Sequence, residues 1–173
     1  LTNSNDNSEE ELINAFLRLL NDDLSYLACI LDTISNLSLS QYDPNLKKIF
    51  DRVMTLLDTC DHNDLPILVR FALDHVQNDE AKDSLSTIFD KVNHFLEDYV
   101  TCVMASAASL QQQVHGGNNS SSSVTNGESF RVRQLEKEKQ EARTAQTLVV
   151  AAFRSSFQSR PVLFQAMLKL LQD

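Results

Sequence analysis

Two helix starts, each followed by an apolar stripe, lie in residues 43–76, DPNLKKIFDRVMTLLDTCDHNDLPILVRFALDHV. Asp43 and Asp64 stand one and two residues ahead of a proline. A carboxylate there accepts from the free amides of a first helical turn, and proline at that turn loses no hydrogen bond. Apolar residues then recur at spacings of three and four, over 46–57 and 65–76. The stretch therefore predicts two amphipathic helices joined by a short break.

The same alternation of stripes and breaks continues on both sides. Ser8–Glu11 has the spacing of a capping box and predicts that a helix starts there, and Asn21–Asp23 predicts a break with a new cap. A further stripe runs from about Asp79 towards Leu110. The stretch from Arg131 to Arg143 is charged and favours a helix, and its continuation to Phe157 is apolar. Ser159–Pro161 then predicts a cap, Ser159, and a proline in the first turn of a last helix.

These serial helices set the fold class. With 3 Gly and 3 Pro in 173 residues, the chain has few of the turn residues that β-hairpins use. We therefore predict an all-α fold in which antiparallel helix pairs form a HEAT-like α-solenoid segment. A helix bundle is the alternative.

Charge and composition divide the chain into three segments. We expect residues 1–113 to be an acidic helical-repeat segment, 114–129 to be a flexible Ser/Gly/Asn-rich loop, and 130–173 to be basic-leaning helices that continue the same solenoid. Residues 1–129 carry 7 Lys/Arg against 20 Asp/Glu, whereas 130–173 carry 8 against 4. Contacts with DNA or a partner are therefore predicted in the last segment, and the alternative is an ordinary solvated helix. The candidates are Arg131, Arg133, Lys137, Lys139 and Arg143.

No motif of a catalytic, cofactor or metal site is present in the sequence. His62 lies near Asp61 and Asp64, but a helix cap and linker explains this cluster better than a metal or acid/base site. We expect no enzyme activity, no cofactor and no metal. The cysteines, Cys29, Cys60 and Cys102, are expected to be buried, reduced thiols of a cytosolic or nuclear protein. The chain reads as an excerpt of a longer protein, and we expect neither a membrane span nor a signal peptide.

The run ILDTISNLSL at 30–39, followed by a helix and by DLPILVRFAL at 64–73, resembles the Fanconi anaemia group D2 protein family. The paralogous group I family is the second choice. The resemblance covers most of residues 24–172, with gaps, and it includes a Ser/Gly-rich loop followed by an apolar helix. It implies an α-solenoid that pairs with a group I-like paralogue, clamps double-stranded DNA and acts in the nucleus. It also implies that a ligase attaches one ubiquitin during interstrand crosslink repair.

One residue departs from the pattern of that family. The family's ubiquitin-acceptor lysine falls on Arg154 in the run AFRSS at 152–156, and a guanidinium is no acceptor. Ser40-Gln41 also matches the pair preferred by DNA-damage checkpoint kinases, which makes Ser40 a candidate phosphorylation site. The alternative to a repair protein is a HEAT-like adaptor that binds proteins and has no connection with DNA.

Overall fold

The computed structural model describes residues 3–37, 39–40, 42–97 and 125–172, and every regular element among them is a helix. The all-α prediction is therefore confirmed for these residues. The elements are α1 (Asn3–Asp22), the 3-10 turn η1 (Leu24–Tyr26), α2 (Leu27–Asn36), α3 (Pro44–Leu56), α4 (Leu65–His75), a helix over residues 81–97, α6 (Thr125–Ser159) and α7 (Pro161–Leu170). Among these helices, none combines the length and apolar character that crossing a bilayer requires.

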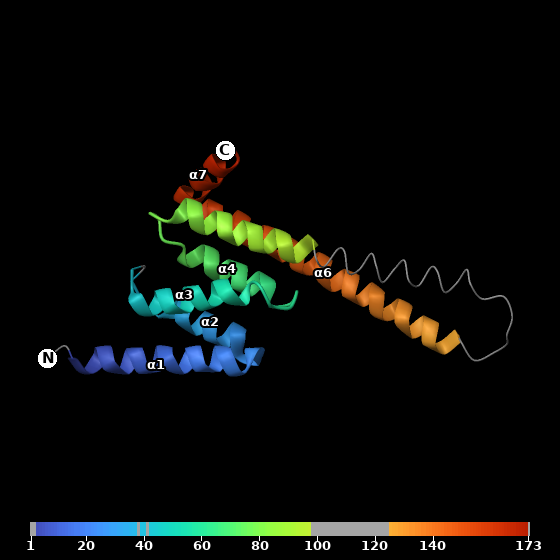
Figure 1. The fold of residues 1–173 in the computed structure, drawn as a ribbon, viewed down its shortest axis with the longest axis horizontal. Helices are drawn as coiled ribbons and strands as arrows, with labels where there is room; N and C mark the ends of the chain where they lie inside the picture. Colours follow the sequence, from blue (N-terminus) through green and yellow to red (C-terminus); the bar gives the residue numbers. More distant parts are fainter. Residues whose placement is uncertain (1–2, 38, 41, 98–124, 173) are drawn as a thin grey trace.

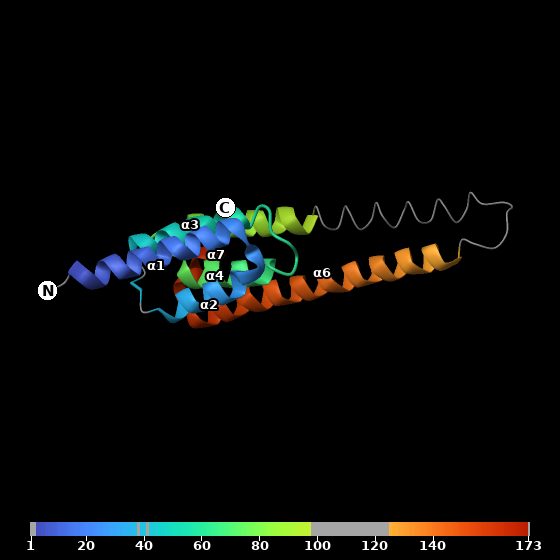
Figure 2. The same cartoon turned by 90° about the horizontal axis from the view of Figure 1, so that it is seen from below.

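The helices stack in the order of the chain (Figure 1). α1 packs on α3, α3 on α4, α4 on α6 and α6 on α7, so α1 and α7 lie at opposite ends of the stack. Seen from below, α1, α3 and the 81–97 helix follow one side of the stack, and α2, α4 and α6 follow the other (Figure 2). The N-terminal part of α6 extends beyond the stack, because 35 residues span roughly 50 Å.

Aspartate side chains form the N-caps of two elements, η1 and α3, where the sequence predicts a cap. Asp23 accepts from the amide of Ser25 at 2.8 Å, and Asp43 accepts from the amide of Asn45 at 2.7 Å. Both predictions are confirmed. Asp64 stands at the N-cap of α4 as predicted, but its side chain makes no capping bond. Its backbone is already helical, and its carbonyl oxygen accepts from the amide of Leu68 at 3.1 Å.

The stripes that the sequence predicts form one hydrophobic core between the two sides of the stack. α4 is the most deeply buried helix and lies in the middle, where it contacts α2, α3 and α6. The side chains buried almost completely are aliphatic, and each removes apolar surface from water. The largest are Ile13, Leu20, Leu27, Ile34, Ile49, Leu57, Leu65, Leu68, Leu73, Leu85, Ile88 and Leu163.

Three predicted helix boundaries are wrong. α1 begins at Asn3 and not at Ser8, and α6 begins at Thr125, inside the loop predicted over 114–129. In both places no proline interrupts the polar residues, and a helix that has formed gains one hydrogen bond for each residue added. The remainder of that loop, 114–124, lies outside the described residues. Ser159 does not cap α7, because it is the last residue of α6 and its hydroxyl donates to the carbonyl oxygen of Ser156.

The prediction for the cysteines holds for one of the two that the structure describes. Cys60 is buried, whereas Cys29 is exposed on α2. The buried stripe of α2 consists of Leu27, Ile30, Leu31 and Ile34, and position 29 falls on the other side of that helix. Cys102 lies outside the described residues.

Candidate functional site

The second half of α6 has one buried side. Ala145, Val149, Ala152 and Ser156 recur at spacings of four, three and four and are all buried, and α6 packs against α4. Small side chains at three of these four positions let the two helices approach closely. The sides of α6 next to this stripe do not face α4 and can contact other helices or a partner.

On one of those sides, an apolar groove of about 540 Å³ lies between α6 and α7. We call it the α6–α7 groove. Its lining residues are Val150, Phe153, Arg154, Phe157, Gln158 and Phe164. Val150 and Phe164 are exposed although they are large and apolar. The groove therefore presents apolar surface that nothing in the described part of the chain covers.

A row of aromatic rings supports this groove. The ring centroids of Phe153 and Phe157 lie 5.8 Å apart, and those of Phe157 and Phe164 lie 6.1 Å apart. Phe89 of the 81–97 helix extends the row, with its ring 6.5 Å from Phe153 in a T-shaped pair. Aromatic pairs at these separations stabilise each other beyond simple burial. The row links three helices and makes the floor of the groove a firm surface.

Among the described residues, Arg154 is the only charged one that lines the α6–α7 groove. Its side chain is exposed, and it makes no ion pair within the described residues. The other polar lining residue, Gln158, is also exposed. This lining suits the binding of an apolar surface that carries a negative charge at its edge.

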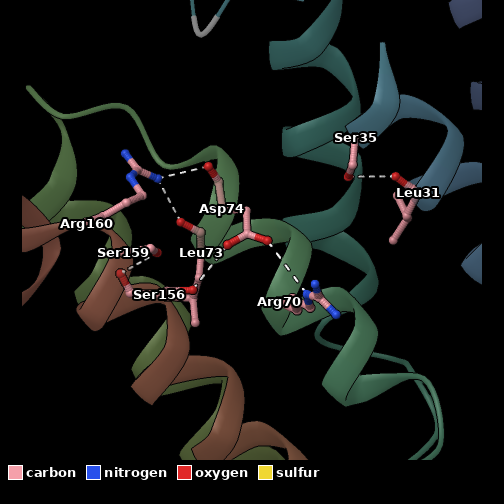
Figure 3. A network of polar contacts seen from close by, with 8 residues as sticks. All are labelled: Leu31, Ser35, Arg70, Leu73, Asp74, Ser156, Ser159 and Arg160. Atoms are coloured by element: carbon pink, nitrogen blue, oxygen red, sulfur yellow. Dashed lines mark hydrogen bonds and ion pairs between the residues drawn. The ribbon is translucent and has the colours of Figure 1, made fainter. Parts of the chain in front are cut away.

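A polar network at the other side of α6 fixes how the two last helices sit on α4 (Figure 3). Arg160, between α6 and α7, donates from Nη1 to the carbonyl oxygens of Leu73 and Asp74, both at 2.9 Å. Its Nη2 donates to the carbonyl oxygen of Val76 at 2.6 Å and to Oδ1 of Asn78 at 2.8 Å. One guanidinium therefore satisfies three carbonyl groups at the C-terminus of α4, where a cation is favoured.

The carboxylate of Asp74 connects this guanidinium cap to α6 and to a second arginine of α4. Ser156 donates from its hydroxyl to Oδ1 of Asp74 at 3.2 Å, and Arg70 lies with Nε 3.8 Å from Oδ2 (Figure 3). Burial lowers the pKa of Arg160, and the carboxylate of Asp74 opposes that change. Arg160 still stays charged at neutral pH, as arginine does in proteins. The network holds α7 in place, and α7 forms one wall of the α6–α7 groove.

His75 lies beside the same network without taking part in it. Its ring is 4.3 Å from that of Phe71, and its buried Nε2 has no hydrogen-bond partner among the described residues. It lines a cavity of about 10 Å³ together with Lys47 and Glu80. Burial lowers the pKa of His75; Asp74 raises it and Arg160 lowers it further. The imidazole is therefore neutral at pH 7.

His62 ties the middle of α6 to the connection between α3 and α4. Its Nε2 lies 3.2 Å from Oε2 of Glu141, and the other oxygen of Glu141 lies 3.5 Å from Nζ of Lys137. The nearby Asp64 has a raised pKa, mainly through burial and also through Asp61, while His62 opposes the change. In the part of the chain that the structure describes, no three His, Cys, Asp or Glu side chains gather as a metal site.

The predicted site residues occupy three separate places. Arg154 lines the α6–α7 groove, and Ser40 is exposed ahead of α3, with Gln41 outside the described residues. The basic candidates follow the first half of α6 and alternate there with Glu136, Glu138 and Glu141. Arg133, Lys137 and Arg143 are exposed, Lys139 is half-buried, and the side chain of Arg131 is not described.

Sequence analysis missed the guanidinium cap and the aromatic row. Arg160 contacts residues 82–87 positions earlier in the chain, so no local pattern could have predicted its partners. Phe153 and Phe157 were assigned to an apolar helix, but their partners lie on other helices. No family model, curated protein sequence or solved structure matches the chain. The resemblance to the Fanconi anaemia group D2 family therefore stays a prediction.

Proposed function

We propose that this chain is a non-enzymatic scaffold segment that binds other macromolecules through the surfaces of its stacked helices. The α6–α7 groove is the observation that carries the proposal. It combines an exposed apolar lining, a row of packed aromatic rings and the exposed cation Arg154. Aromatic and arginine side chains are the types that dominate the energy of protein interfaces.

We further propose that the helices belong to a HEAT-like α-solenoid. Two features of the stack support this. The pairs α1–α3, α3–α4, α4–α6 and α6–α7 pack in succession along the stack, and the helices alternate between two sides of the stack (Figure 2). Solenoids grow in this way and offer long surfaces for partners.

The more specific proposal is a segment of a nuclear DNA interstrand crosslink repair protein. Such a segment would pair with a Fanconi anaemia group I-like paralogue, clamp double-stranded DNA and be regulated by one ubiquitin. Support comes from the resemblance over 30–39 and 64–73, and from the exposure of Arg154 at the acceptor position. A modified side chain must be reachable by its ligase.

The charges of α6 support the alternative, an adaptor that binds proteins and not DNA. In residues 131–143, five basic residues are interleaved with three glutamates, and Lys137 lies 3.5 Å from Glu141. A helix that clamps phosphates usually concentrates positive charge on one face. This part of α6 lacks that concentration, so protein binding explains it with fewer assumptions.

Binding to the paralogue and to DNA distinguishes the repair proposal from the protein-adaptor alternative. The repair proposal expects co-purification with a group I-like paralogue. It also expects that the pair binds duplex DNA and that its affinity falls steeply between about 50 and 200 mM salt. The slope of the logarithm of the affinity against the logarithm of the salt concentration should be roughly proportional to the number of phosphates contacted. Arg133→Gln together with Arg143→Gln should reduce that slope, and Arg70→Gln on α4 is the exposed control. Binding to neither partner would leave only the protein adaptor.

Modification tests the placement of the acceptor. In a reaction with the protein, its group I-like partner, duplex DNA and the cognate conjugating enzyme and ligase, the native chain should not be modified over residues 148–158. Arg154→Lys should gain a ubiquitin remnant at residue 154, read by peptide mass spectrometry. If another lysine is modified in both versions and residue 154 is not, the acceptor lies elsewhere, with Lys137, Lys139 and Lys169 as candidates.

A further inference from the structure

Both ends of the helix stack expose apolar side chains. One end is formed by α1 (Figure 1). It presents Leu12 and Leu19, which are 41% and 42% exposed, with the exposed Ala15 between them. Spacings of three and four place these three residues on one stripe of the helix. We call Leu12, Ala15 and Leu19 the α1 stripe. It lies apart from the buried Ile13 and Leu20, which face the core.

The opposite end carries the α6–α7 groove and further exposed apolar residues of α7. Phe164 is 48% exposed, and Val162, Leu168 and Leu171 are exposed as well. A stack of helices that is closed at its ends has polar outer faces there. In the described part of the chain, both ends expose apolar side chains, on α1 beside the exposed Glu11, Arg18 and Asp22, so each end offers a surface on which another helix can pack.

The two ends carry opposite charges. α1 contains five acidic residues and one basic residue, whereas residues 142–172 contain four basic residues and no acidic one. Glu11, next to Leu12, is exposed and makes no ion pair within the described residues, whereas Glu10 is already held 3.6 Å from Lys48. Arg154 is the matching cation in the groove, and it has no ion pair in the described part of the chain. An acidic amphipathic helix is therefore what the groove fits, and the chain itself carries one.

We propose that copies of this chain associate head to tail, with the α1 stripe of one copy seated in the α6–α7 groove of the next. The apolar side chains of the stripe cover the aromatic row, and Glu11 lies at the edge near Arg154. The two surfaces differ, so the contact is heterologous. Every complex keeps one uncovered α1 stripe and one unfilled α6–α7 groove. Association therefore continues with rising concentration. The inference needs neither the paralogue nor DNA, and it is tested on this chain alone.

Blocking one end at a time tests the proposal. Leu12→Asp with Leu19→Asp blocks the α1 stripe, and Val150→Asp with Phe164→Asp blocks the groove. All four side chains are exposed, so we expect the helical circular dichroism to persist. Leu148→Asp is the matched control, because Leu148 is exposed on α6 but lines a different depression with Ile67 and Arg70.

Sedimentation velocity reads the result. The wild-type chain and the Leu148→Asp control should grow in mass with concentration, while each blocked variant alone should stay a monomer. A one-to-one mixture of the two blocked variants should form a complex of two chains and grow no further. The proposal is overturned if the wild-type chain stays monomeric throughout, or if a blocked variant still dimerises by itself. In the first case, the groove serves a different protein.

Charge exchange gives a second test that does not depend on apolar substitutions. Glu11→Arg and Arg154→Glu should each weaken self-association at least tenfold. In a mixture of these two variants, the arginine introduced at position 11 of one chain meets the glutamate introduced at position 154 of the other. Association should then recover to within about threefold of the wild type. If either single variant associates as well as the wild type, the seating of α1 in the groove is wrong.

Discussion

Nη2 of Arg160 lies 2.6 Å from the carbonyl oxygen of Val76, the C-cap residue of α4. An arginine from the α6–α7 connection therefore caps the C-terminus of a helix that lies more than eighty residues earlier in the chain. Carbonyl groups at a helix C-terminus have no partner within the helix, and they gather partial negative charge. The contact thus caps α4 and also fixes the position of α7 relative to α4.

Removing this guanidinium should destabilise the fold more than removing any exposed arginine. Arg160→Ala leaves the carbonyl groups of Leu73, Asp74 and Val76 to water, and we expect the free energy of unfolding to fall by about 2–3 kcal/mol. Arg160→Lys keeps the charge but cannot reach several acceptors at once, so it should recover less than half of that loss. Urea unfolding measures both. Arg154→Ala is the control and should change the value by less than about 0.5 kcal/mol.

The packing of α6 on α4 depends on a small polar residue. Ser156 is 2% exposed and donates to Oδ1 of Asp74 at 3.2 Å. Ser156→Ala should lower the free energy of unfolding by about 1 kcal/mol, and Ser156→Leu by about 1–3 kcal/mol, because the larger side chain forces the helices apart. Ser155 is exposed, so Ser155→Ala should have little effect. Equal effects of the two alanine substitutions would contradict this account.

The all-helical fold follows from the sequence because caps and stripes are local signals. Asp43 binds an amide two residues away, and the stripe from Leu46 to Leu56 repeats within a single helix. The helix starts at Asn3 and Thr125 were missed for the same reason. Neither start is followed directly by an apolar stripe, and each lies where a helix simply continues outwards from a stable stretch.

The candidate site depends instead on contacts between distant residues. Arg154 was identified by resemblance, but its position in an apolar groove depends on α7 and on the rings of Phe157 and Phe164. The partners of Arg160 lie on α4 and just after it. Periodicity shows which side of a helix is apolar, but it does not show which other helix covers that side. The groove could therefore not be predicted.

Acid should weaken the fold through His75. Its folded-state pKa is below the ordinary value of 6.5, mainly because of burial, so the unfolded chain takes up the proton first. The contribution of His75 is complete above about pH 6.5 and is lost as the pH falls below it. Asp74, Arg160, Lys47 and Glu80 surround the ring and remain in the variant. In urea unfolding at pH 7.5 and 5.5, His75→Gln should lose less stability than the wild type; parallel losses would contradict this.

Thiol reactivity should separate the two described cysteines by their surroundings. Burial raises the pKa of Cys60 to about 11, and the carboxylates of Asp64, Asp61 and Asp58 add to this effect. Only the thiolate reacts, so at pH 8 roughly one Cys60 in a thousand carries the reactive form even when it is accessible. In a Cys102→Ser background, iodoacetamide should therefore label the exposed Cys29 at least about 100-fold faster than Cys60. Peptide mass spectrometry follows both rates.

Urea should remove the difference between the two labelling rates, because the slow labelling of Cys60 depends on the folded chain. Cys29→Ser should leave the slow rate of Cys60 unchanged. Comparable labelling of both residues in the folded chain would mean that the connection between α3 and α4 opens to solvent.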